Sequence, residues 1–208
     1  MENENIDENK ILNPWLSIWF KPRETISRIT AAKPLKIILL LGILTGIELC
    51  FSFFSRKENI GQFSLTQTLL IILLAGPVAG VACIFITSTL IKITGGWLGG
   101  NGSIMNIGAA VACGNIPIIC SLPFSILTML LSVKIAAANN AVFIQALVVD
   151  MYIVLAIWSF FILLNCLMQV QGFFSLWGSF FNLLLTQLLI FLLFIMGVYI
   201  INLLNILM

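Results

Sequence analysis

Long apolar stretches alternate with short polar segments along most of the chain. A helix needs about 20 apolar residues to cross a hydrocarbon core about 30 Å thick, because each residue advances the helix by 1.5 Å. The connecting segments are too short to fold as separate domains, so we expect a single domain. The pattern predicts five membrane-spanning helices, at about residues 36–54, 68–93, 104–132, 143–169 and 181–206.

The third apolar stretch is the least regular of the five. It contains Asn115, Pro117 and Pro123, and a proline removes a helical hydrogen bond and clashes with the preceding turn. One interpretation is a discontinuous helix, which in transporters exposes backbone groups to a substrate. The other is an ordinary proline kink in which Asn115 bonds to a neighbouring helix. A split into two half-membrane pieces would change the number of spans.

The composition agrees with a bilayer as the solvent. Hydrophobic residues make up 61% of the chain and charged residues 9%, against roughly 45–50% and about 25% in an ordinary soluble domain. The mean hydropathy is +1.13. A chain of this length has too little interior to hide so much apolar surface from water. The expected fold class is an all-α, polytopic membrane bundle.

The N-terminal part differs from the rest. Residues 1–12 are polar and acidic without periodicity and are predicted to form a disordered tail, which leaves 13–208 as the membrane domain. Prolines divide the next segment into two short helical pieces in which aromatic and basic residues mix. Such a segment is typical of a helix lying at the headgroup boundary. Its expected lipid-contacting residues are Trp15, Trp19, Lys21, Arg23, Arg28 and Lys33.

The basic residues also predict the topology. With five spans, Arg56, Lys57 and Lys134 flank one side of the membrane, and the other Lys and Arg residues flank the side that carries the N-terminus. The positive-inside rule then places the N-terminus in the cytoplasm and the C-terminus outside.

Two acidic residues, Glu48 and Asp150, lie within apolar stretches, where a charge costs several kcal/mol unless it finds a partner, a proton or water. Counted from the span ends, both fall in the outer half of the bilayer. They are therefore candidates, with Asn115, for one polar intramembrane site that binds a proton or a cation. The alternative is two neutral or hydrogen-bonded carboxyls near the outer interface.

Small residues recur at helical spacing in the first two spans. Pairs of glycines four residues apart let two helices approach closely, and Pro77 is expected to kink the second span. The residues expected to kink or pack helices are Gly42, Gly46, Gly76, Pro77, Gly80, Pro117 and Pro123.

Several kinds of chemistry are not expected. The chain has no histidine and no CxxC pair, so we predict no metal site, no cofactor and no enzyme activity. The stretch GGWLGGNGS lacks the GK[ST] ending of a phosphate-binding loop and no buried strand precedes it, so we interpret it as a turn. No nucleic acid partner is expected.

Three stretches together resemble the bacterial branch of the Yip domain family of Ypt/Rab-interacting membrane proteins. They are the opening NPWLSIWFKPRETISRI, the glycine-rich turn with the span after it (GGWLGGNGSIMNIGAAVACGNIP), and the fourth span with Trp158. The resemblance covers the chain from about residue 13 onward and implies five spans with a cytoplasmic N-terminus. Similar eukaryotic proteins reside in Golgi and endoplasmic reticulum membranes and associate with one another and with prenylated Rab GTPases. A small GTPase partner is implied only by that analogy, and the resemblance implies no catalytic residue.

Two functional hypotheses follow from the sequence. The first is a non-enzymatic scaffold in a bacterial cytoplasmic membrane, which acts through helix packing, lipid contact, and association with itself or with other membrane proteins. The second is a small transporter or channel with a polar site at Glu48, Asp150 and Asn115.

Overall fold

The computed structural model describes residues 14–32, 34–54, 64–135 and 140–207. Within these ranges the secondary structure is helical, without a strand. The expected tail at 1–12 and Lys33 lie outside the described residues. The helices are α1 (Pro14–Phe20), α2 (Pro22–Ala31), α3 (Leu35–Phe54), α4 (Leu65–Trp97), α5 (Ile104–Gly114), α6 (Ile116–Ile119), α7 (Leu122–Ile135), α8 (Asn140–Gln171) and α9 (Leu176–Leu207).

Four of these helices, α3, α4, α8 and α9, are long and apolar enough to cross a membrane. The predicted third span is a bent pair: Ile104–Gly114 and Ile116–Met129 meet at 42°. The described part of the chain therefore holds five spans if the bent pair counts as one. The expected all-α membrane bundle is confirmed.

Local sequence signals set several helix ends. The Ser64 side chain accepts a hydrogen bond from the backbone N–H of Gln67, and the Gln67 side chain accepts one from the N–H of Ser64. This capping box starts α4. The glycines in the turns after α4 and α8, Gly99 and Gly172, have φ of 82° and 73°, a conformation that side chains disfavour.

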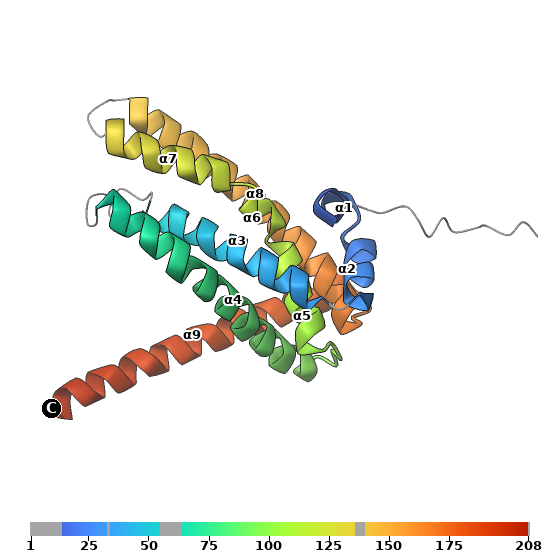
Figure 1. The fold of residues 1–208 in the computed structure, drawn as a ribbon. Helices are drawn as coiled ribbons and strands as arrows, with labels where there is room; N and C mark the ends of the chain where they lie inside the picture. Colours follow the sequence, from blue (N-terminus) through green and yellow to red (C-terminus); the bar gives the residue numbers. More distant parts are fainter. Residues whose placement is uncertain (1–13, 33, 55–63, 136–139, 208) are drawn as a thin grey trace, which may run out of the picture.

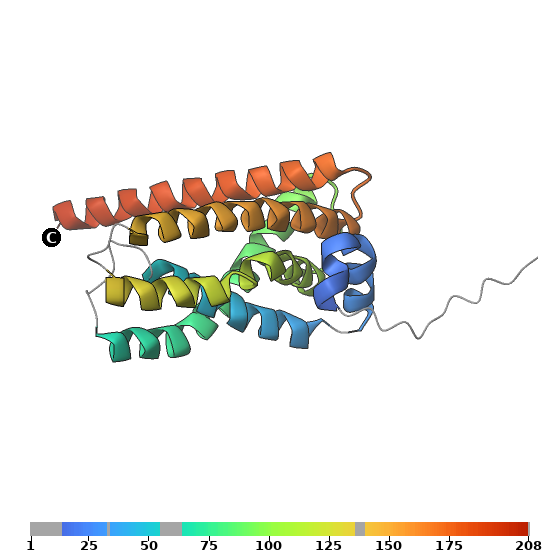
Figure 2. The same cartoon turned by 90° about the horizontal axis from the view of Figure 1, so that it is seen from above.

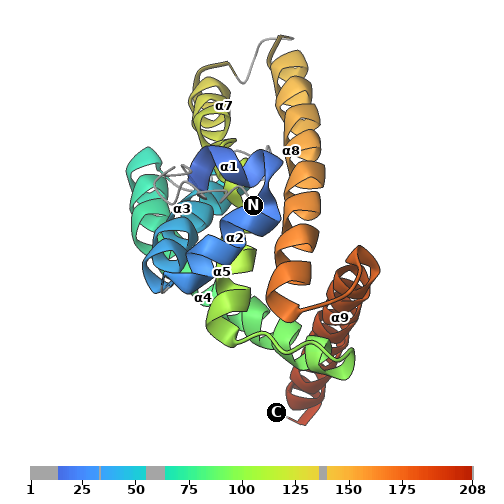
Figure 3. The same cartoon turned by 90° about the vertical axis from the view of Figure 1, so that its right-hand side faces the viewer.

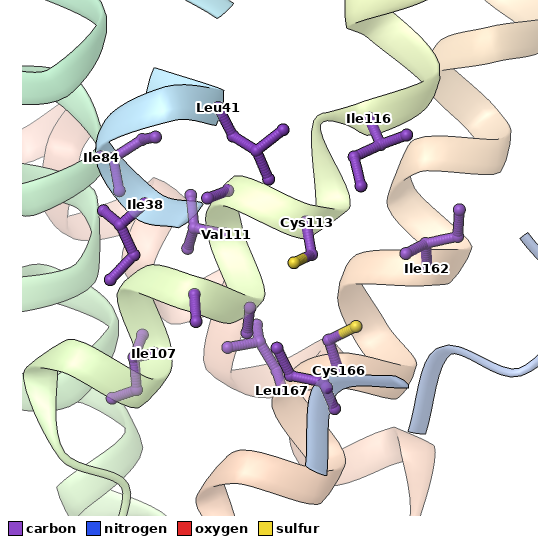
Figure 4. Close-up of a cluster of buried hydrophobic side chains, with 14 of the residues drawn as sticks. Ile38, Leu41, Ile84, Ile107, Val111, Cys113, Ile116, Ile162, Cys166 and Leu167 are labelled. Carbon is purple, nitrogen blue, oxygen red and sulfur yellow. The ribbon is translucent and has the colours of Figure 1, made fainter. Parts of the chain in front are cut away.

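Helix α5 is the centre of the packed core. It contacts α3, α4 and α8, and its residues from Ile107 to Gly114 are all buried. Figure 4 shows its side chains among those of α3, α4 and α8, including Ile38, Ile84 and Leu167. Because alanine and glycine dominate this stretch, the three longer helices approach α5 closely.

Helix α9 is the least packed of the long helices. It contacts α4 and α8, through residues of its N-terminal half such as Phe180 and Asn182. Figure 1 shows the rest of it diverging from the bundle, and Figure 2 shows that it runs back in the direction opposite to α8. Of its apolar window, 6% is buried inside the fold, against 33% for α3. The outer half of α9 therefore depends on lipid or on another protein for its cover.

The N-terminal helices dock on the bundle. Ile18 of α1 and Ile26 of α2 are fully buried and belong to the main hydrophobic cluster. The guanidinium Nε of Arg23 donates a hydrogen bond of 2.9 Å to Asn165 Oδ1 on α8. Figure 3 shows both short helices lying across the end of the bundle where α3 begins. This collar, α1 with α2, is therefore fixed to the membrane domain rather than tethered loosely.

Candidate functional site: a buried glutamate among serines

Glu48 is the one acidic side chain that the described part of the chain buries completely, with 0% exposure. It lies about 20 Å along α3 from Leu35, at 1.5 Å per residue. This position is past the middle of the 20-residue helix. The carboxyl group is thus held inside the fold at a depth where hydrocarbon surrounds the protein.

Three serine hydroxyls surround one oxygen of this carboxyl. The distances to Glu48 Oε1 are 2.7 Å from Ser52 Oγ, 2.9 Å from Ser121 Oγ and 3.0 Å from Ser125 Oγ. Ser52 and Ser125 are themselves 3.3 Å apart. We call Glu48, Ser52, Ser121 and Ser125 the Glu48 cluster.

The break in the third span brings two of these serines into place. Helix α5 ends at Gly114, the short α6 follows, and Ser121 immediately precedes α7. Ser121 and Ser125 are one turn apart on the face that meets α3, and α7 packs against α3 and α8. The Ser159 hydroxyl on α8 donates to the carbonyl oxygen of Gly114. That bond satisfies a backbone group which the end of α5 leaves without a helical partner.

The second carboxyl oxygen is different. Glu48 Oε2 is buried and has no hydrogen-bond partner among the described residues. The ion pairs that the structure records link Glu24 to Lys21 and Arg28 on the surface of α2. A carboxylate without a cationic partner is costly in a site of this kind.

The other two residues of the predicted polar site are placed differently. Asp150 is exposed on α8, and the recorded hydrogen bonds of Glu48 come from serines. Of the two interpretations, a shared site and two separate carboxyls, the described structure records no contact between Glu48 and Asp150 that favours the first. Residue counting gives the depth of each carboxyl but not the face of the helix on which it lies. Asn115 is half-buried and caps α5 through its backbone N–H.

Sequence reasoning missed the three serines. A signal was present, because Ser52 follows Glu48 by one helical turn and Ser121 precedes Ser125 by one turn. That spacing shows which serines share a face, but it does not show that the two faces meet.

The glycines of the first two spans form a separate contact. Gly42 and Gly46 of α3 face Gly76 and Gly80 of α4 so closely that a Cβ atom at Gly46 would overlap the carbonyl oxygen of Gly76. Pro77 lies inside α4, which continues through it. This contact holds two backbones together and leaves no room there for a ligand.

The glycine-rich turn after α4 is tied to α8. The Gln171 side chain accepts a hydrogen bond from Gly102 N–H at 3.0 Å and donates one to Ile91 O at 3.3 Å. Beside it, the Thr94 hydroxyl lies 2.7 Å from Asn182 Oδ1 on α9. Buried polar groups thus connect the turn to α8 and the end of α4 to α8 and α9.

Aromatic side chains surround the same end of the bundle. The exposed fractions are 65% for Trp97, 67% for Trp177 and 106% for Phe174. On the collar, Trp15 and Phe20 are exposed at 37% and 85%. Exposed tryptophans at one level are typical of the membrane–water interface. The basic residues of the collar, Lys21, Arg23 and Arg28, are exposed as well.

These features together define a polytopic α-helical membrane protein with a docked N-terminal collar and a buried carboxyl site. The Yip1 domain family model matches residues 16–199, which is most of the chain. The chain belongs to the Yip1 domain family, and the resemblance seen in the sequence is confirmed at the level of the family. No curated protein and no solved structure matches the chain.

Proposed function

We propose that this chain is a non-enzymatic scaffold of a bacterial cytoplasmic membrane, with its N-terminus in the cytoplasm, that organises anionic lipid and membrane-protein partners around its collar. The observation that carries the proposal is the collar itself. Its apolar face is buried against α5 and α8, while Lys21, Arg28 and Phe20 remain exposed at the end of the bundle. Rigid docking presents cations and aromatic rings at one level, which suits a headgroup layer.

The free energy of attraction between the collar and anionic lipid can be approximated from its cations. Each Lys or Arg near an anionic leaflet contributes about 1 kcal/mol. Replacing Lys21 and Arg28 by glutamine thus removes at most about 2 kcal/mol of attraction, because Glu24 pairs with both cations, and this limit corresponds to roughly a 30-fold change in lipid preference. Arg23 is left in place because its hydrogen bond to Asn165 holds the collar.

The test uses the full chain in vesicles that contain brominated lipids, which quench tryptophan fluorescence on contact. We expect brominated anionic lipid to quench more strongly than brominated zwitterionic lipid at equal content. The Lys21→Gln/Arg28→Gln variant should lose most of that difference, and Ser27→Ala, at an exposed position of α2, should keep it. Equal quenching by both lipids in the unchanged protein contradicts the proposal.

Partners within the membrane are part of the same proposal. The outer half of α9 is exposed apart from the half-buried Gly197, and it carries the exposed amide side chain of Asn202; Gln187, in the inner half, is exposed as well. Amides in hydrocarbon gain from interhelical hydrogen bonds of about 0.6–2 kcal/mol. This favours association with a second copy or with another membrane protein through α9.

A second candidate function is a small transporter or channel, and one observation favours it. The unpartnered Oε2 of Glu48 lies in a polar cluster beside a broken helix, an arrangement that transporters use at substrate sites. Proton- or cation-dependent solute uptake in proteoliposomes, abolished by Glu48→Gln in a protein that still folds, would support this function over the scaffold.

A further inference from the structure

The Ser121 hydroxyl has two acceptor-type neighbours and one hydrogen. Its Oγ lies 2.6 Å from the carbonyl oxygen of Ile118 and 2.9 Å from Glu48 Oε1. A hydroxyl donates one hydrogen and accepts others, whereas a carbonyl oxygen only accepts. The shorter contact favours donation from Ser121 to Ile118, and a full hydrogen bond between Ser121 and Glu48 then needs the hydrogen of a protonated carboxyl group. An ionised carboxylate has no hydrogen to give.

From this count we infer that Glu48 is a proton-binding site. The protonated Oε1 donates to Ser121 Oγ and accepts from Ser52 Oγ, and Ser121 in turn donates to the carbonyl oxygen of Ile118. Ser125 donates to the same carboxyl oxygen or to Ser52. In this assignment the contacts from 2.6 to 2.9 Å around Ser121 and Ser52 are all O–H···O hydrogen bonds.

The surroundings of the carboxyl favour a proton over a charge. The charged side chains described on α3 and α4, Lys36 and Lys92, are exposed, as is Asp150 on α8. The other titratable side chains on the segments around Glu48 are the thiols of Cys50, Cys83, Cys113 and Cys120. A thiol carries no positive charge in either protonation state, so none of them can pair with a carboxylate as a cation. The recorded hydrogen-bond partners of the carboxyl group are neutral hydroxyls. Leaving the buried Oε2 of a neutral acid unpaired costs less free energy than leaving a buried charge uncompensated.

The distances also favour a proton over a metal cation. The hydroxyl oxygens approach Oε1 to 2.7–3.0 Å, which is the range of direct O–H···O bonds. Oxygens that share a bound cation turn their hydrogens away from it and are held apart by their mutual repulsion. The bound proton therefore ties α3 to the start of α7 through a direct hydrogen bond.

Infrared spectroscopy of the full chain in lipid nanodiscs near neutral pH tests this assignment. A protonated carboxyl shows a C=O stretching band well separated from the bands of a carboxylate. We expect such a band in the unchanged protein and its loss in Glu48→Gln. Ser121→Ala removes the acceptor of the acid proton, so the band should move to higher frequency.

A matched control separates this effect from the loss of any buried serine. Ser88→Ala removes a fully buried hydroxyl that bonds to its own helix at Ile84 O, and it should leave the band unmoved. Should Glu48→Gln fail to fold, isotope-labelled glutamate distinguishes the band in Ser121→Ala and Ser88→Ala. Carboxylate bands alone in the unchanged protein, or an identical shift in both serine variants, would overturn the assignment. An acid band that disappears on adding sodium would mean a cation site and would also overturn it.

Discussion

Replacing Gly80 by alanine tests how closely α3 and α4 approach. A Cβ atom at Gly80 would lie 2.6 Å from the backbone Cα and N of Gly46 and would overlap the carbonyl oxygen of Gly42. Ordinary contact begins at 3.4 Å, and backbone atoms of a neighbouring helix have no rotamer by which to yield. The two helices must therefore separate along the contact between the glycines.

The expected cost follows from overpacking. Forcing an extra methyl group into a well-packed contact costs about 1–3 kcal/mol. The matched control is Gly96→Ala in the same helix, where a Cβ atom would meet nothing within 4 Å. Alanine gains helix propensity at both positions, more at the interior Gly80 than at Gly96 in the last turn of α4, so their difference is a lower limit on the cost of the clash. Gly76→Ala should fall between them, because its Cβ would lie 3.1 Å from the Gly46 carbonyl oxygen.

The measurement is the free energy of unfolding in mixed micelles, taken from a denaturing-detergent titration followed by tryptophan fluorescence. We expect Gly80→Ala to be less stable than Gly96→Ala by about 1–3 kcal/mol. Equal stability of these two variants would refute the close approach of α3 and α4 and, with it, the packing role of the glycine pairs.

Three further outcomes are expected. Gln171→Leu leaves the N–H of Gly102 and the carbonyl oxygen of Ile91 without their side-chain partner. The same titration should show a loss of about 1–3 kcal/mol in the free energy of unfolding. An unchanged free energy would contradict the two hydrogen bonds of Gln171. Ser159→Ala removes the hydroxyl that bonds the Gly114 carbonyl and should speed amide exchange around the bend between α5 and α6, with exchange in α9 as the internal reference. Reporters fused to the two ends of the chain should report opposite sides of the membrane, and a shared side would exclude an odd number of spans.

The sequence alone determined the class of fold. Long apolar stretches in a chain with 9% charged residues are compatible with few folds. In hydrocarbon, the peptide groups of such a stretch must form hydrogen bonds within their own segment, as they do in a helix. The break in the third span was also visible, since Asn115, Pro117 and Pro123 stand where a helix would otherwise continue. These features depend on residues that are neighbours along the chain, so the sequence is enough to predict them.

The tertiary structure decided which faces meet. Residue counting gave Glu48 and Asp150 similar depths, yet the rotation of each helix about its axis buries one carboxyl and exposes the other. The partners of Glu48 became visible only when α7, turned by the bend after α5, placed Ser121 and Ser125 against α3. Depth follows from the number of residues along one helix, whereas contact depends on the packing of several helices at once, and the sequence of a single helix does not contain that packing.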